Sequence, residues 1–148
     1  MEDKKYFSRQ IDESLMAWKN STRHKPLLLR GARQVGKSSS VRHLAKQFDN
    51  FVEINFERKP AYLEIFKGDR DAKHIVEMIK SITGEPIVPG KTLLFFDEIQ
   101  MCQEAISSLR FFWEDMPGLH VIAAGSLLEF ALSEIPTFGV GRFQSMFV

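Results

Sequence analysis

The chain has 148 residues, of which 44% are hydrophobic and 26% are charged, and its formal net charge at pH 7 is +1. These values are typical of one globular domain with an ordinary hydrophobic core, and they exclude a disordered or fibrous protein. Basic and acidic residues are interleaved, so the charge pattern gives no support for a nucleic-acid partner, although it does not exclude one.

The first elements along the chain form a strand, a glycine-rich loop and a helix, after one preceding helix. Apolar residues three and four apart predict that first helix over residues 6–20, packed against the edge or end of a sheet. The apolar run 27–29 then predicts a strand buried on both faces. Glycines interrupt the pattern from 31 to 36, and apolar residues at helical spacing predict a helix over 41–48.

Strands and helices continue to alternate through the rest of the chain. Breakers such as Pro60 and Gly68 predict an irregular connection after the second strand. The predicted strands are 51–55, 92–97 and 120–124, and the predicted helices are 72–79, 103–116 and 127–132. This alternation predicts a three-layer α/β/α sandwich with a mainly parallel sheet.

We expect a single domain over 1–148, with the N-terminal helix in 1–22 and a nucleotide-binding core in 27–148. The segment 143–148 has the composition of a fifth strand, with no turn, cap or polar tail after it. We therefore expect a fragment truncated near that strand.

Cysteine and histidine usage gives little sign of a metal or redox site. The single Cys102 cannot form an internal disulfide, and the N-terminal segment is too charged for a secretory signal, which favours a cytoplasmic setting. The four histidines have no metal-ligand spacing, so we expect them to be solvated or to cap helices. No apolar stretch approaches the roughly 20 residues that a membrane-spanning helix needs.

The loop between the first strand and its helix carries the strongest chemical signal. Gly31-Ala-Arg-Gln-Val-Gly-Lys-Ser38 matches G-x-x-x-x-G-K-[ST], and its strand–loop–helix context is the one that a phosphate-binding P-loop requires. Glycines let backbone N–H groups converge on an anion, the lysine reaches the β- and γ-phosphates, and the serine ligates Mg²⁺. A glycine-rich turn with a surface lysine is the weaker alternative. The predicted nucleotide contacts are Gly31, Ala32, Arg33, Gln34, Val35, Gly36, Lys37, Ser38 and Ser39.

An acidic pair follows the apolar strand 92–96. Ligands of open α/β sheets bind outside the carboxyl ends of the strands, where Asp97 and Glu98 are expected to lie. We predict that Asp97 holds Mg²⁺ together with Ser38, and that Glu98 orients or deprotonates the attacking water. A helix cap or a solvated turn is the alternative for such a pair.

Three strings taken together resemble a known family. The strings Gly-Ala-Arg-Gln-Val-Gly-Lys-Ser at 31–38, Phe-Asp-Glu-Ile-Gln at 96–100 and Ala-Gly-Ser-Leu-Leu-Glu at 124–129 resemble a bacterial and archaeal family of AAA-type P-loop ATPases, over nearly the whole chain. The resemblance implies that the strand ending at Ala124 lies between the strands ending at Arg30 and Asp97. It also implies a distinct C-terminal region, which this chain lacks.

Two further site residues follow from this resemblance. Ser126 matches the sensor-1 region, where a polar side chain contacts the γ-phosphate or the attacking water; capping the following helix is an equally good interpretation. Arg142 lies where many AAA-type proteins carry an arginine finger that acts across a subunit interface, against the alternative of a surface arginine. The second role would require a homo-oligomer.

The leading hypothesis is therefore Mg²⁺-dependent ATP binding and hydrolysis that drives a conformational change in a larger AAA-type ATPase. The first alternative is a nucleotide-dependent binding module, a switch with little intrinsic hydrolysis. A small-molecule kinase would need an arginine-bearing lid, and no arginine-rich segment after Ala124 supplies one. The choice of ATP over GTP relies on the resemblance and on the absence of an Asn-Lys-x-Asp sequence.

Overall fold

The computed structural model describes residues 10–31, 36–68, 71–126 and 144–147. Within them, five parallel strands form one sheet with the order β2-β3-β4-β1-β5. The strands are β1 Leu27–Arg30, β2 Asn50–Asn55, β3 Thr92–Asp97, β4 His120–Ala124 and β5 Gln144–Phe147. The α-helices are α1 Gln10–Asn20, α2 Lys37–Ala45, α3 Ala72–Thr83 and α4 Gln103–Asp115, and the 3₁₀ helices are η1 Pro60–Phe66 and η2 Ile99–Met101.

The strand β4 occupies the centre of the sheet. Leu28 of β1 pairs with Ala123 of β4, and Leu94 of β3 pairs with Val121 on the other side of the same strand. This order confirms the arrangement implied by the family resemblance, with the strand that ends at Ala124 between those that end at Arg30 and Asp97. Parallel strands require long crossovers, and the helices between them supply these.

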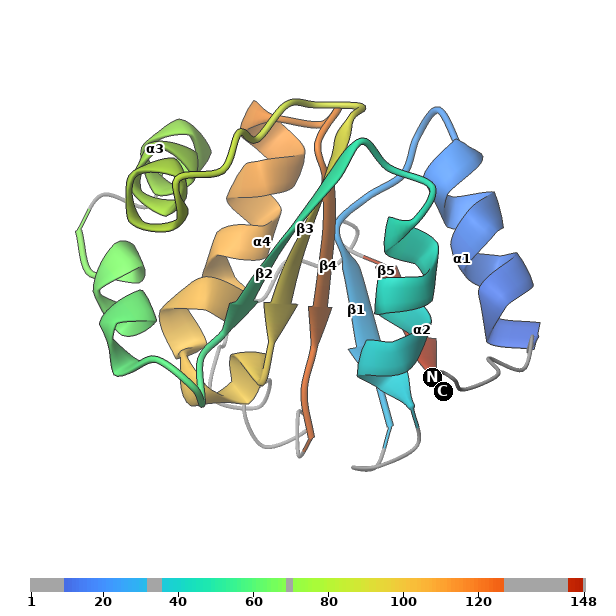
Figure 1. Ribbon diagram of the computed structural model, residues 1–148, viewed down its shortest axis with the longest axis horizontal. Helices are drawn as coiled ribbons and strands as arrows, with labels where there is room; N and C mark the ends of the chain where they lie inside the picture. Colours follow the sequence, from blue (N-terminus) through green and yellow to red (C-terminus); the bar gives the residue numbers. More distant parts are fainter. Residues whose placement is uncertain (1–9, 32–35, 69–70, 127–143, 148) are drawn as a thin grey trace.

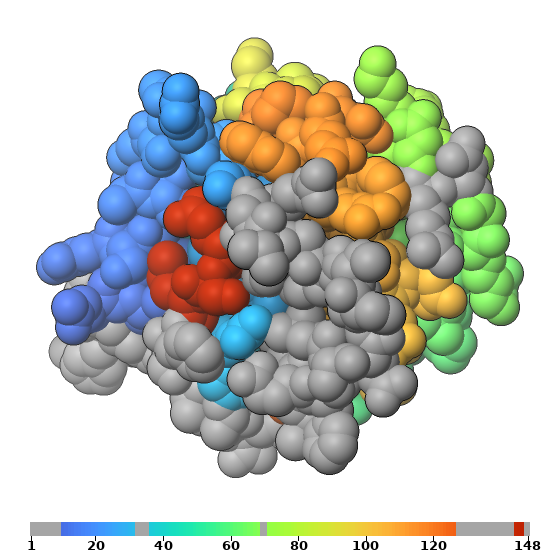
Figure 2. Space-filling model, turned by 180° about the vertical axis from the view of Figure 1, so that it is seen from behind, coloured from blue at the N-terminus to red at the C-terminus, as the bar shows by residue number. Residues whose placement is uncertain are grey.

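Helices cover both faces of the sheet, which confirms the predicted three-layer sandwich (Figure 1). Alternate side chains of each strand point to opposite faces. Leu27 and Leu29 pack with α1 and α2, whereas Leu28 packs in the cluster that contains η1, α3 and α4. In the view from behind, α4, in orange, lies on the face of the sheet to which Leu28 points (Figure 2). In the same view β5, in red, lies beside α1, in blue.

Most predicted elements are present, with shifts at their ends. The helix α2 begins directly at Lys37, four residues before the first apolar residue that predicted it, because the helix grows out of the glycine loop. The connection after β2, expected to be irregular, contains the 3₁₀ helix η1. The predicted helix 127–132 lies outside the described residues. None of the described helices is long and apolar enough to cross a membrane.

Two of the histidines differ from the expectation of solvated or capping side chains. His24 and His120 are buried and stacked, with ring centroids 3.7 Å apart and an interplanar angle of 18°. The indole of Trp18 lies edge-on to both rings, and its Nε1 donates to the carbonyl of Lys25 at 2.7 Å. Trp18 of α1, His24 of the segment before β1 and His120 of β4 thus form one aromatic cluster that joins three separate parts of the chain.

The surroundings of the stacked pair favour neutral imidazoles. His120 Nε2 donates to the carbonyl of Lys19 at 2.9 Å, which assigns the proton to Nε2. The Nδ1 atoms of both rings are buried, with no hydrogen-bond partner in the described part of the chain. Burial, and secondarily the neighbouring His120, lowers the pKa of His24 to about 4; burial also lowers the pKa of His120.

We expect the protein to lose stability as the pH falls from 7 to 5. The folded-state pKa of His24 lies below its ordinary value of 6.5, so the unfolded chain binds more protons in the window between these values. The contribution is complete above pH 6.5 and declines as the pH falls towards 4. Urea unfolding should show a loss on the order of 1–2 kcal/mol between pH 7 and pH 5.

A His24→Phe variant keeps an aromatic ring in the stack and removes the titrating group, so its stability should depend less steeply on pH. His74→Gln is the matched control, because His74 is exposed on α3. An unchanged pH slope in the His24→Phe variant would contradict the assignment.

Candidate functional site

The two glycines at the ends of the glycine loop have backbone conformations that favour glycine. Gly31 has φ 148° and Gly36 has φ 84° with ψ 22°, conformations that side-chain-bearing residues rarely adopt. Gly36 also accepts the first helical hydrogen bond, from Ser40 N at 3.0 Å. The positive end of α2 is thereby directed at the loop. The predicted contacts Ala32, Arg33, Gln34 and Val35 lie outside the described residues.

Lys37 and Ser38 are the first residues of α2, and their side chains form hydrogen bonds with Gly31 of the loop and with Asp97 at the end of β3. Lys37 is 9% exposed, and its Nζ donates to the carbonyl of Gly31 at 2.9 Å, so the ammonium folds back over the loop. Ser38 Oγ donates to Oδ2 of Asp97 at 2.9 Å, across 59 residues of sequence. The predicted phosphate-binding and metal-binding residues therefore meet at one point.

Asp97 is a buried carboxylate in an acidic neighbourhood. Burial raises the pKa of this carboxyl above its usual value, and the charges of Glu98 and Glu53 act in the same direction. Hydrogen bonds from Ser38 and from the Glu98 N–H, the latter at 2.9 Å, oppose that rise. A divalent cation would compensate the buried negative charge.

The oxygens at this point fit Mg²⁺ in the way it is usually held beside phosphates. One hydroxyl, from Ser38, and one carboxylate, from Asp97, lie in contact, and both are hard oxygen ligands. No group of three or more His, Cys, Asp or Glu side chains that could hold a metal ion occurs among the described residues. A cation here would therefore need phosphate and water oxygens to complete its coordination.

Glu98 lies at a sharp turn of the backbone. Its φ of 55° and ψ of 45° place it in the left-handed region, where a non-glycine residue costs on the order of 1 kcal/mol. The turn ends β3 and starts η2, with Met101 N donating to the Glu98 carbonyl at 3.1 Å. Asp97 and Glu98 are thereby both kept at the carboxyl end of the strand. Such local strain is common at functional sites.

The sites predicted from separate motifs line one cavity. Ser126, 8% exposed, follows β4 and reaches the same edge of the sheet as Asp97. The cavity has a volume of about 200 Å³ and is lined by Gly36, Lys37, Ser38, Ser39, Asp97, Glu98, Gly125 and Ser126. Gly125 was not predicted as a site residue, although a glycine directly after a buried strand was a visible signal. Arg142 lies outside the described residues.

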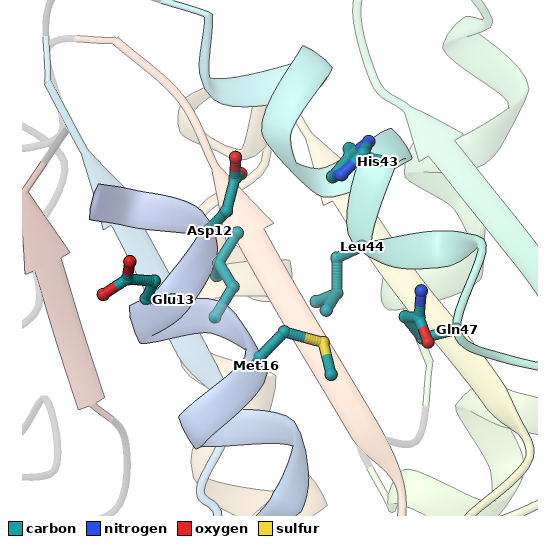
Figure 3. A pocket seen from close by; sticks show the side chains of 7 residues that line it. Asp12, Glu13, Met16, His43, Leu44 and Gln47 are labelled. Carbon is teal, nitrogen blue, oxygen red and sulfur yellow. The ribbon is translucent and has the colours of Figure 1, made fainter. Parts of the chain in front are cut away.

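Two larger hollows lie away from these residues. One, of about 460 Å³, lies between α1 and α2, where Asp12, Met16 and His43 are among its lining side chains (Figure 3). The other, of about 320 Å³, lies at the end of β2, where Arg42 forms a bidentate salt bridge with Glu53. Neither contains the glycine loop or the Asp97–Glu98 pair. The candidate site is therefore not the largest of the three hollows, and the chemistry of its lining side chains is what distinguishes it.

Comparisons with known proteins agree with this geometry. The model of a family described as "AAA domain" matches residues 23–148. The fold is similar to that of the Walker-type ATPase PABY2304 of Pyrococcus abyssi, with a TM-score of 0.59 and 19% identity over 97% of this chain and 53% of that one. It is also similar to a chain of a closed-state cryo-EM reconstruction of Hsp104 with ATPγS and FITC-casein, with a TM-score of 0.62 and 20% identity over 94% of this chain and 26% of that one. No match was found among curated proteins.

A Ser38→Ala substitution should raise the pKa of Asp97 in the nucleotide-free protein. The serine hydroxyl donates to the ionised carboxylate and so favours the charged form, and its loss leaves burial less opposed. A carboxyl ¹³C chemical-shift titration measures this change. Ser39→Ala, at the exposed neighbouring position, should leave the titration unaltered. A titration in Ser38→Ala identical to that of the wild type would contradict the contact.

Proposed function

This chain belongs to the AAA domain family, and we propose that it binds ATP with Mg²⁺ and hydrolyses it to drive a conformational change in a larger protein. The observation that carries the proposal is the meeting of Lys37, Ser38, Asp97 and Glu98 at one cavity. A lysine and a serine at the start of a helix, a buried aspartate and a second carboxylate are groups that P-loop enzymes use to bind phosphates, hold Mg²⁺ and position the attacking water, which supports the proposal.

Each part of the cavity has a role in this proposal. The loop N–H groups and the Lys37 ammonium bind the β- and γ-phosphates, for which the left-handed Gly36 at the start of α2 and the position of Lys37 give support. Ser38 and Asp97 hold Mg²⁺, which when bound neutralises charge on the phosphate oxygens. Glu98 accepts a proton from the attacking water, and Ser126 hydrogen-bonds the γ-phosphate or that water.

The chain spans 53% of the Pyrococcus protein and 26% of the Hsp104 chain. We propose, as the resemblance to AAA-type ATPases implies, that the conformational change acts on a C-terminal region and within a homo-oligomer, in the cytoplasm. In that assembly Arg142 acts as an arginine finger on the nucleotide of a neighbouring subunit. The sequence position of Arg142, just before β5, supports this role.

Glu98→Gln in the full-length gene product should retain ATP binding and lower kcat by about 100-fold or more, because an amide cannot accept the proton of water. Binding is measured by titration with a fluorescent ATP analogue and Mg²⁺, and turnover by phosphate release. Lys37→Ala should instead lose binding itself. Glu77→Gln is the matched control, since Glu77 is exposed on the outer face of α3 and pairs only with Lys80 among the contacts described.

If Glu98→Gln hydrolysed ATP at the wild-type rate, the catalytic assignment would be wrong. Loss of binding in Glu98→Gln would equally contradict a purely catalytic role for this carboxylate.

Arg142→Ala separates hydrolysis in an assembly from the alternative of a switch with little hydrolysis. An arginine finger acting in trans contributes about 10³-fold to kcat, and its removal should leave ATP binding intact. Mixing Arg142→Ala with Glu98→Gln subunits should restore part of the turnover, since each supplies what its neighbour lacks. Turnover that is insensitive to both Arg142 and protein concentration would favour the switch.

A further inference from the structure

Gln100, in η2, holds the side chain of Glu98 from one side. Its Nε2 donates to Oε1 of Glu98 at 2.8 Å. An ionised carboxylate only accepts hydrogen bonds, so the amide nitrogen must face Glu98 and the amide oxygen must face the other way. The orientation of the amide is therefore fixed by the chemistry of its partner.

The other end of the amide lies against Gly125. The Oε1 atom of Gln100 is buried and has no hydrogen-bond partner among the residues that the structure describes. A Cβ built on Gly125 would overlap this oxygen and would lie 3.3 Å from the backbone nitrogen of Ile99. The space that Gln100 occupies therefore exists because residue 125 has no side chain.

This contact joins two elements of the cavity that are far apart in sequence. Glu98 follows β3, whereas Gly125 and Ser126 follow β4, and all three line the same cavity of about 200 Å³. Gln100 reaches from the first element to the second, between a carboxylate that it orients and a backbone against which it is packed. A shift of the turn that carries Ser126 would consequently displace the amide and change the orientation of Glu98.

We propose that Gln100 is a positioning residue that orients Glu98 for hydrolysis and couples that orientation to the turn at Gly125–Ser126. The inference builds on the proposed function, in which Glu98 activates water and Ser126 meets the γ-phosphate or that water. Gln100 acts through Glu98 and does not itself contact substrate. Its loss should affect kcat and spare ATP binding, because neither the glycine loop nor the metal-binding oxygens depend on it.

Two substitutions break the same arrangement from opposite sides. Gln100→Leu keeps the size of the side chain and removes the hydrogen bond. Gly125→Ala keeps Gln100 and displaces its amide; the φ of Gly125 is not in the left-handed region, and beside the overlap with the amide the new Cβ makes one tight contact, 3.3 Å from the backbone nitrogen of Ile99. Each variant should lower kcat about tenfold or more with Kd for ATP within about twofold, the size of effect expected when a catalytic group is misplaced by around 1 Å.

The combined effect on kcat of substitutions at Gln100 and Gly125 distinguishes a positioning role from a merely structural one. In Gln100→Ala the space beside Gly125 is empty, so adding Gly125→Ala should cause little further loss, and the two effects should not add. In a Glu98→Gln background, Gln100→Leu should leave the residual turnover unchanged, because its effect passes through Glu98. Met101→Ala is the control on the same turn, since Met101 is 53% exposed.

The experiment measures kcat, ATP Kd and thermal unfolding of these variants in the full-length gene product. The expected result is a selective loss of kcat in folded Gln100→Leu and Gly125→Ala, with non-additivity in the double variant. Wild-type kcat in Gln100→Leu, an equal loss of ATP binding, or additive effects would overturn the inference while leaving the proposed function intact. Turnover that does not depend on Glu98 would refute the proposed function itself, and this inference with it.

Discussion

The insertion of β4 between β1 and β3 is the constraint on which the site depends. Adjacent strands lie about 4.8 Å apart, so the strand that carries the glycine loop and the strand that carries Asp97 are separated by roughly 10 Å. That separation leaves room beyond the strand ends for Ser38, at the start of α2, whose hydroxyl donates to Asp97 at 2.9 Å. Because β4 ends between these two strands, Gly125 and Ser126 line the cavity too.

Electrostatics at this edge follow from burial in the sheet. Asp97 and Glu98 lie together at the carboxyl end of β3, and burial raises the pKa of Asp97; Glu53, on the neighbouring strand β2, is nearby but is paired with Arg42. Such a concentration of acid beside a glycine loop is unfavourable unless positive charge is near. The helix end, Lys37 and a divalent cation would each supply some of it, which gives the site a physical reason to bind a metal–nucleotide complex rather than the nucleotide alone.

The opposite end of the sheet is held by a different kind of contact. His120, the first residue of β4, stacks on His24 and bonds the last turn of α1 through Lys19. The strand that leads to Gly125 and Ser126 is thus held at its other end by aromatic packing. The candidate site and this aromatic cluster lie at opposite ends of the same strand, although their chemistry is unrelated.

The sequence by itself predicted most of the described elements, and it predicted a phosphate-binding chemistry for the loop. Local periodicity located β3 and β4 at their observed bounds, and the glycine spacing predicted the phosphate loop because its requirements lie within eight consecutive residues. The resemblance to AAA-type ATPases supplied the strand order, which spacing could not. Roles for Glu98, Ser126 and Arg142 remain proposals.

Only the tertiary structure decided which distant residues meet. No local pattern relates His24 to His120, and the sequence alone predicted that the histidines are solvated or cap helices. The two rings stack because the sheet places the start of β4 beside the segment that precedes β1. Likewise, the space that Gln100 takes beside Gly125 arises from two loops that follow different strands. Periodicity reports which face a side chain has within its own element, whereas contacts between elements depend on how the sheet orders its strands.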